Sequence, residues 1–282
     1  MIFSVKQDYI VSFGGYHSFI AAITARLRGV RCFIILNGTD STAIPEFNYG
    51  HLRKGLLKYC CIKSYQWSTK LLPVSESLIY TINEYCFERK LLGLNAVKKN
   101  DWNYQVIPNG FDINFWKRTE KPDPKSIITV ASSNRLTHKG VDLLFELAEK
   151  RPDFSIAIAG LDAINGCPPN VSFLGYLTAE QLRDAYSSSS YYFQLSIWEG
   201  FGCSLCEAML CGCIPIVSDV NVLPEIVGSQ NHVLKKKSIS ELDVLLNNLI
   251  NANVDEKEFI NRIKQLYSID LRIEALINQL KL

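Results

Sequence analysis

The stretch Glu199-Gly-Phe-Gly-Cys-Ser-Leu-Cys-Glu207 decides the interpretation of this chain, because it places two carboxylates eight positions apart around a glycine-containing turn. An apolar run precedes it at Tyr191–Leu195, and another follows it at Ile214–Val217. Cys203–Leu210 has the length and composition of a short buried helix. The glycines ahead of that helix allow a sharp turn of the backbone. The pattern therefore predicts a strand, a loop, a helix and a second strand.

The predicted loop opens onto the N-terminus of the predicted helix, where backbone N–H groups have no partner within the helix. Together with the positive end of the helix dipole, such groups favour a bound anion such as a phosphate. Phe201, Gly202 and Cys203 occupy this position. We therefore expect these three residues to contact a phosphate-bearing substrate.

Glu199 and Glu207 need a different explanation, because a carboxylate repels a phosphate. As hydrogen-bond acceptors they suit hydroxyl groups on either side of a diphosphate, as in a nucleoside diphosphate sugar. Glu207 would accept from the ribose diol and Glu199 from the transferred sugar. The alternative is a solvated loop residue and a helix-surface carboxylate. The apolar surroundings of Glu207 favour a ligand, since an unpaired buried charge is costly.

This stretch resembles the E-x7-E signature of the retaining GT-B glycosyltransferases of group 1, or family 4. Three further segments are similar to that family in the same order, Ile107-Pro-Asn-Gly-Phe-Asp112, Phe173-Leu-Gly-Tyr176 and Leu223-Pro-Glu-Ile-Val-Gly228. The resemblance implies an α/β fold of GT-B type, with two Rossmann-like, doubly wound parallel sheets. It also implies that a hexosyl group moves from a nucleoside diphosphate sugar to a hydroxyl acceptor with retention at the anomeric carbon, without a metal or another cofactor.

Two cations lie in Ser133-Asn-Arg-Leu-Thr-His-Lys-Gly140, between a predicted strand and a predicted helix. Open α/β sheets bind ligands at the carboxyl ends of their strands. Arg135 and Lys139 could therefore stabilise the charge that grows on a departing diphosphate, which is the role the resemblance implies. Their spacing is one residue shorter than in many relatives, which favours Lys139 over Arg135. The alternative is two solvated loop cations.

Further candidates lie in the N-terminal half. Asn37-Gly-Thr-Asp40 stands where many relatives have H-G-T-D, so the resemblance implies that Asn37 and Asp40 bind substrate. His17 follows a glycine turn and is a candidate for contact with the sugar or acceptor, although a lone histidine is more often structural. Ser75 matches the family's V-S-E-S segment, and Asn109 lies in its I-P-N-G segment.

Strands alternating with helices predict two α/β domains. We expect a shortened N-terminal acceptor-side domain at 1–116, a linker at 117–125, a nucleotide-sugar-binding domain at 126–265, and a last helix at 266–282. Family precedent has that helix cross back to the N-terminal domain. Within the first domain, Ser75 is expected to cap a helix that runs to about Leu92, and Gln105–Ile107 is expected to form a strand.

The composition excludes several classes of function. The chain has 282 residues and a formal charge of +2, without a basic stripe, so nucleic acid is not an expected partner. Nine cysteines, mostly in apolar runs, resemble reduced core residues and indicate the cytoplasm. Four of them lie on or near one short helix without a distant second half, so no metal site is expected. Neither a signal peptide nor a membrane span is evident.

The segment Tyr49–Trp67 is expected to be helical and carries Arg53, Lys54, Lys58 and Lys63 among apolar residues. Such a face could make peripheral contact with anionic lipid at the inner face of a membrane. A solvated face that covers a core is the commoner outcome.

Relatives usually carry additional βα units before the first strand predicted here. The chain would then be a truncated reading frame, a degenerate copy, or half of an enzyme completed by a partner chain. Two alternatives to a transferase stay open, a non-catalytic or split-subunit nucleotide-sugar-binding module and a GT-B-shaped sugar nucleotide epimerase. Family habit suggests a glycan or lipid-linked acceptor in polysaccharide biosynthesis, and leaves open whether the nucleotide is UDP, GDP or ADP.

Overall fold

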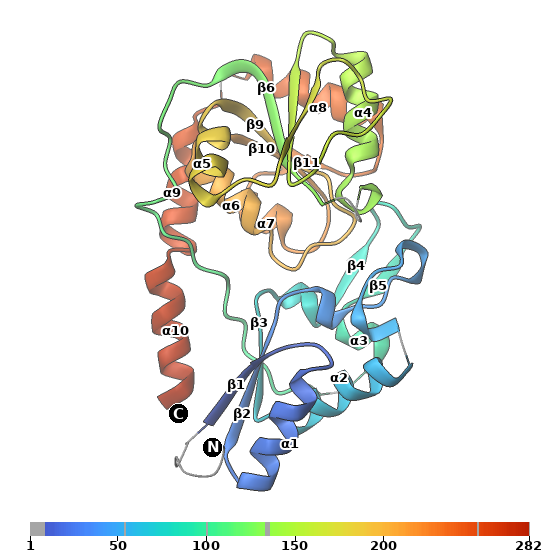
Figure 1. Ribbon diagram of the computed structural model, residues 1–282, viewed down its shortest axis with the longest axis vertical. Coiled ribbons are helices and arrows are strands. Elements are labelled where there is room, and N and C mark those ends of the chain that lie inside the picture. The colour runs from blue at the N-terminus through green and yellow to red at the C-terminus, as the bar shows by residue number, and fades with distance from the viewer. Residues whose placement is uncertain (1–8, 54, 100, 133–135, 253, 282) are drawn as a thin grey trace. The chain divides into compact units, whose positions relative to one another are not determined.

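The computed structural model describes residues 9–53, 55–99, 101–132, 136–252 and 254–281 (Figure 1). The chain divides into two compact units. The first unit comprises the described parts of Met1–Ile82, Arg89–Asn109 and Arg272–Leu282. The second unit comprises Asn83–Glu88 and the described parts of Gly110–Leu271. Each unit contains a parallel sheet and helices, so the predicted α/β class is confirmed.

A three-stranded parallel sheet with β2 at its centre organises the first unit. Its strands are β1 (Tyr9–Phe13), β2 (Arg31–Leu36) and β3 (Lys70–Pro73), and the main helices are α1 (Ser18–Arg28) and α2 (Gly55–Trp67). Every residue of β2 after Arg31 is buried, as expected for a parallel strand covered on both faces. The two helices pack against each other, and the Ser18 and Ser64 hydroxyl oxygens lie 2.6 Å apart.

The prediction of a helix from Ser75 to Leu92 is wrong. The segment instead forms a short turn and a two-stranded sheet of β4 (Thr81–Asn83) and β5 (Lys90–Leu92), followed by α3 (Leu94–Val97). The Asn83 side chain explains the break, because its Oδ1 accepts a hydrogen bond from the Tyr85 backbone N–H at 3.1 Å. Such a local bond competes with the helical hydrogen-bond pattern.

The predicted strand Gln105–Ile107 does not form a regular strand either. The chain does run beside β3, since Gln105 N donates to Leu71 O at 3.0 Å and Ile107 N donates to Pro73 O at 2.9 Å. Pro73 has no backbone N–H to donate to the neighbouring segment, so the hydrogen-bond ladder between the two segments is interrupted. The pairing is reduced to one parallel bridge between Leu71 and Tyr104.

The second unit is built on six parallel strands in the order β11-β10-β9-β6-β7-β8. Their bounds are β6 (Asp123–Val130), β7 (Ser155–Ala159), β8 (Val171–Gly175), β9 (Ser189–Gln194), β10 (Ile214–Ser218) and β11 (Val233–Leu234). The chain winds from β6 toward one edge and then restarts beside β6 with β9, which makes this sheet doubly wound. The loops that leave the carboxyl ends of β6 and β9 therefore lie side by side, where such sheets bind ligands.

Helices flank this sheet (Figure 1). They are α4 (Val141–Lys150), α5 (Ala179–Ser187), α6 (Cys203–Leu210), α7 (Leu223–Val227), α8 (Ile239–Asn251) and α9 (Glu256–Leu266). Helix α4 packs with α8, and α6 packs with α9. Within the described ranges, every helix falls short of the length and apolarity that a bilayer crossing requires.

Residues 117–125, the expected linker, are attached to the second unit. The Arg118 guanidinium donates to Ser187 O and Gly212 O, and β6 already begins at Asp123. The boundary between the units that lies nearest to this expected linker is between Asn109 and Gly110.

The last helix, α10 (Ile269–Lys281), belongs to the first unit from Arg272 onward. Arg272 Nη1 donates to Pro108 O at 2.6 Å and to Asn109 Oδ1 at 2.7 Å. Further along the helix, Lys70 Nζ donates to Gln279 Oε1 at 3.0 Å. Segments from both ends of the chain are therefore part of the first unit.

The loop after β6 is fastened to the carboxyl end of β9. Ile197 N donates to His138 O at 2.9 Å. Gly140 has φ of 72°, and a Cβ at this position would lie 2.4 Å from Leu195 O. Glycine is therefore required both for the left-handed backbone and for the close approach of the two loops.

Gly140→Ala is expected to destabilise the protein by about 2–4 kcal/mol, because left-handed strain adds to overlap with a backbone oxygen. Gly166→Ala is the matched control, since Gly166 also has a left-handed φ of 77° but its Cβ would meet nothing within 4 Å. The control is expected to cost only about 1 kcal/mol. Urea denaturation of both variants measures the difference, and equal costs would contradict the close approach.

Candidate functional site

The loop between β9 and α6 forms as the sequence predicts. The chain leaves β9 at Gln194 and enters α6 through Gly202, whose φ of 98° is left-handed. A Cβ on Gly202 would lie 2.8 Å from Leu223 Cδ2, so the tight entry also depends on packing against α7. The N–H groups of the first turn of α6 therefore face the loop that carries Glu199.

Glu199 is held by three donors that converge on one carboxylate oxygen. Its Oε1 accepts hydrogen bonds from Gln194 Nε2 and Ser196 Oγ, both at 2.7 Å. The same oxygen forms an ion pair with the Lys139 ammonium. Among the described residues, Oε2 receives no hydrogen bond. One oxygen thus fixes the side chain, and the other is uncommitted.

The Lys139–Glu199 ion pair is largely shielded from water, with side-chain exposures of 20% and 13%. Burial raises the pKa of the Glu199 carboxyl, but the charge and hydrogen bond of Lys139, aided by Ser196, outweigh burial and hold that pKa below its ordinary value. Glu199 is therefore ionised at neutral pH, and Lys139 compensates its charge.

Glu207 has the opposite environment. It lies half-buried on α6, where its carboxylate makes no ion pair with a described residue and the Tyr186 hydroxyl is the side-chain donor beside it. Burial raises the pKa of Glu207 to about 7, while the nearby Tyr186 lowers it by a smaller amount. A ligand that donates hydroxyl hydrogen bonds would stabilise the ionised form.

A pocket of about 280 Å³ opens beside these residues at the carboxyl ends of the strands. It is formed by the ends of β6 and β7, the segment after β8, and the start of α6. Its lining residues are Val130, Ala131, Ser132, Lys139, Ala159, Gly160, Tyr176, Leu177, Leu182 and Ser204. Its described lining residues combine apolar side chains with the Lys139 cation, which suits a ligand with both a flat apolar part and an anionic part.

The candidates of the N-terminal half follow the three strands of the first sheet. His17 follows β1, Asn37 and Asp40 follow β2, and Ser75 follows β3, so all four belong to loops at the carboxyl edge of this sheet. His17 and Asn37 are exposed, whereas Ser75 is buried and its hydroxyl oxygen lies 2.8 Å from that of Ser77. Asn109 accepts from Arg272.

Asp40 is used inside its own loop. Its carboxylate accepts from the backbone N–H of Asn37 at 3.0 Å and of Gly38 at 2.8 Å. Burial raises the pKa of Asp40, and these two backbone hydrogen bonds act in the opposite direction. The Tyr65 hydroxyl donates to Asp40 O at 2.9 Å and thereby ties the loop to α2. Asp40 shapes the loop that presents Asn37.

Comparison with known families gives the site its context. Residues 112–266, more than half of the chain, match the family described as glycosyl transferases group 1. The chain belongs to this family. The match includes Lys139, Glu199, Glu207 and the whole pocket beside them, whereas the candidates His17 to Asn109 precede it.

Curated relatives of this group 1 glycosyltransferase are longer than the chain. It is 23% identical over 180 residues to a phosphatidylinositol N-acetylglucosaminyltransferase subunit of Arabidopsis thaliana, covering 58% of this chain and 40% of the relative. It is 33% identical over 72 residues to O-antigen chain mannosyltransferase B of Escherichia coli, covering 26% of this chain and 19% of the relative. The chain thus aligns with less than half of each relative.

Solved structures show the same fold. The crystal structure of Anabaena HepE in complex with UDP and glucose has a TM-score of 0.77 at 17% identity, covering 97% of this chain and 77% of that protein. Sucrose-phosphate synthase of Thermosynechococcus elongatus has a TM-score of 0.71 at 14% identity, covering 97% and 73%. At these identities the likeness establishes the fold alone, which is the predicted GT-B-like α/β fold.

The structure brings some predicted residues together and changes the setting of others. Lys139 and Glu199 are directly paired, and Cys203 is exposed at the start of α6. The Phe201 ring is buried against Phe111, with ring centroids 6.2 Å apart, so its side chain anchors the loop. Arg135 lies outside the described residues.

Sequence reasoning missed several residues of the site. Gln194 and Ser196 position Glu199, and the signal available was their closeness to it in sequence. Tyr176 lines the pocket, but the sequence indicated it only as the last residue of the family motif Phe173–Tyr176 and not as a site residue. His51 lies beside the Gly15 turn, where a Cβ on Gly15 would be 3.0 Å from His51 Nδ1. No local pattern relates His51 to that turn.

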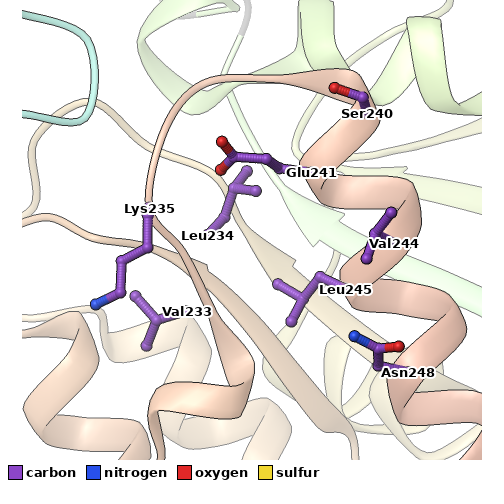
Figure 2. A pocket seen from close by; sticks show the side chains of 8 residues that line it. All are labelled: Val233, Leu234, Lys235, Ser240, Glu241, Val244, Leu245 and Asn248. Atoms are coloured by element: carbon purple, nitrogen blue, oxygen red, sulfur yellow. The ribbon is translucent and has the colours of Figure 1, made fainter.

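A second pocket, of about 350 Å³, lies between β11 and α8 (Figure 2). Figure 2 shows Val233, Leu234 and Lys235 on the β11 side of the pocket, opposite side chains of α8 such as Glu241 and Leu245. Lys235 is paired with Asp219 at 3.1 Å. None of its lining residues comes from the loops that carry Lys139 and Glu199, so this pocket is separate from the site around Glu199. Within the part of the chain that the structure describes, no group of three His, Cys, Asp or Glu side chains is arranged to hold a metal ion.

Glu207→Gln is expected to change the pH dependence of stability. The folded-state pKa of about 7 exceeds the ordinary value of 4.5, so the stabilising contribution of the protonated carboxyl is complete below about pH 4.5 and is lost as the pH rises through 7. Between pH 5 and 8 the wild type should lose about 2 kcal/mol more unfolding free energy than the variant. Urea denaturation across that range measures this loss. Glu225→Gln, at an exposed carboxylate, is the control, and parallel profiles for wild type and Glu207→Gln would contradict the assignment.

Proposed function

We propose that this group 1 glycosyltransferase transfers a hexosyl group from a nucleoside diphosphate sugar to a hydroxyl acceptor, with retention and without a metal ion. The observation that carries the proposal is Glu207. A half-buried carboxylate that no described cation compensates is costly unless a ligand uses it, and it lies on the helix that borders the pocket. A ribose diol would supply two hydroxyl donors to it.

The nucleoside would occupy the pocket at the ends of β6, β7 and β8, with its base near Tyr176 and its diphosphate toward Lys139 and the start of α6. Lys139 has three N–H donors, of which Glu199 engages one, so the ammonium can also contact a phosphate. Because Lys139 neutralises Glu199, that carboxylate repels an incoming diphosphate less than an unpaired one would. Arg135 is a second candidate for the same phosphates.

In the proposed reaction the bond between the anomeric carbon and the diphosphate oxygen breaks, and its electron pair stays on the diphosphate. Lys139 and the N–H groups at the start of α6 stabilise this charge without reorganisation. The acceptor hydroxyl oxygen bonds to the anomeric carbon on the same face, and its proton passes to the departing diphosphate. Glu199, through its uncommitted Oε2, orients a hydroxyl of the sugar.

UDP is the first nucleotide to test, because the solved Anabaena neighbour contains UDP and glucose. The relatives named as phosphatidylinositol N-acetylglucosaminyltransferase subunits and as an O-antigen mannosyltransferase support a lipid-linked or glycan acceptor. We propose that the reaction takes place at the cytoplasmic face of a membrane, where a lipid-linked acceptor would be reached.

A partner chain on the first unit is part of the proposal. Strand β1 is at the edge of its sheet, and the alternate side chains Tyr9, Val11 and Phe13 are exposed. Parallel sheets are usually covered on both faces, so additional polypeptide would suit this surface. Nucleotide binding without turnover, followed by turnover on adding a partner, would favour the split-subunit hypothesis.

Calorimetric titration with UDP and with GDP, without metal, tests the donor site. We expect binding of at least one nucleotide, and a loss of tenfold or more, about 1.4 kcal/mol, in both Lys139→Ala and Glu207→Ala because each removes a charge-assisted hydrogen bond. Lys264→Ala and Glu225→Ala, at exposed sites away from the pocket, are the matched controls. Failure of the folded wild type to bind UDP, GDP or ADP in such a titration would refute the proposal.

Glu199→Gln separates binding from catalysis. The substitution removes the charge that pairs with Lys139, so affinity for UDP, which lacks a sugar, should stay equal or increase. Release of UDP from a UDP-sugar should fall roughly 100-fold or more, because the group that orients the sugar becomes neutral. UDP affinity and UDP release are measured on the same preparation. A large loss of UDP affinity would mean that Glu199 mainly maintains the structure of the loop.

A further inference from the structure

Helix α2 carries a pocket of about 360 Å³ that the proposed transfer reaction does not use. Six of its lining residues follow helical spacing along one face of α2, one is the last residue of α3, and one follows α3 directly. They are Gly55, Lys58, Tyr59, Ile62, Lys63, Gln66, Val97 and Lys98. The opposite face of α2 packs into the first unit through Cys61 and Tyr65, which are buried. The pocket is therefore on the outer side of a helix whose inner side is already used.

Three lysines surround this pocket without a compensating acid. Lys58, Lys63 and Lys98 line it, and no carboxylate is among the lining residues. In the part of the chain that the structure describes, none of the three makes an ion pair. Lys63 Nζ lies 5.9 Å from the centre of the Tyr59 ring, a weak cation–π contact that leaves its donors available. Like charges around one pocket favour an anion with several acceptor oxygens.

Apolar side chains border the same pocket. Ile62 is buried at its base, and Val97 lies on its wall. Leu56 and Tyr59 project from the adjacent turn of α2 with exposures of 76% and 53%. A soluble anion would bind to the lysines but would gain nothing from the exposed Leu56 and Tyr59 side chains. Clustered lysines beside exposed apolar groups match an anionic membrane surface, where phosphates lie above an acyl region.

We propose that the α2–α3 face binds an anionic lipid surface, with the phosphate of one headgroup held among Lys58, Lys63 and Lys98 and with Leu56 inserted beside it. The sequence left two interpretations of this helix open, a lipid-binding face and a solvated face, and the proposal adopts the first. The proposal does not depend on donor binding or sugar transfer, because its test needs no nucleotide.

The experiment is co-sedimentation of the full chain with phosphatidylcholine vesicles that contain or lack phosphatidylglycerol. We expect at least tenfold stronger partition onto the anionic vesicles. The triple variant Lys58→Gln, Lys63→Gln, Lys98→Gln should lose at least tenfold, since each basic residue at an anionic surface contributes on the order of fivefold. The Lys→Arg triple variant should retain binding and shows that charge is what matters.

A control with the same change of net charge is Lys236→Gln, Lys257→Gln, Lys264→Gln, at exposed positions of the second unit, and it should change partition less than twofold. Leu56→Ser should weaken partition several-fold. If the two glutamine triples behave alike, the attraction is only net charge and the proposal is overturned. It is also overturned if inorganic pyrophosphate abolishes vesicle binding while Leu56→Ser has no effect, because the pocket would then take a soluble phosphate.

Discussion

The ion pair between Lys139 and Glu199 joins loops that are 60 residues apart in the chain, and the site of the second unit depends on it. Sheet order brings the two loops together, and Gly140 lets their backbones touch. Removing one member of a shielded pair leaves an uncompensated charge, so the pair resists rearrangement. Gln194 and Ser196 fix the carboxylate further by donating to the same oxygen. The charges are thus in place before a ligand arrives, which is the condition under which they stabilise a growing diphosphate charge most effectively.

The two glutamates of one short stretch are held in different states because their partners differ. Glu199 has a cation and two neutral donors, and its pKa is lowered. Glu207 has no compensating cation, burial outweighs the opposing effect of Tyr186, and its pKa rises to about 7. A fixed charge would suit the role proposed for Glu199, which is to orient one hydroxyl of the sugar. A group that titrates near neutrality is better suited to report whether a ligand is bound, because hydroxyl donors convert it to the ionised form.

Features that depend on neighbours in sequence could be predicted, and those that depend on distant segments could not. The loop and helix around Gly202 follow from glycines and an apolar run, and both form as predicted. The helix after Ser75 fails because Asn83 engages Tyr85 and also donates to Ile197 O at 2.7 Å, 114 residues away. The Lys139–Glu199 pair depends on sheet order, which no local pattern contains. The Phe201 side chain, assigned to substrate, has its aromatic partners elsewhere in the chain.

The two units also differ in how far their candidate polar side chains form hydrogen bonds within the protein. In the first unit Asp40, Ser75 and Asn109 all meet protein partners, so they maintain loops and leave Asn37 and His17 as exposed candidates for contact with a ligand. In the second unit the Glu207 carboxylate has no compensating cation among the described residues, and a pocket borders the helix that carries it. Unused polar groups indicate where a ligand contributes binding energy, since satisfied groups have little left to offer. Donor affinity should therefore reside in the second unit, and acceptor choice should depend on few side chains of the first.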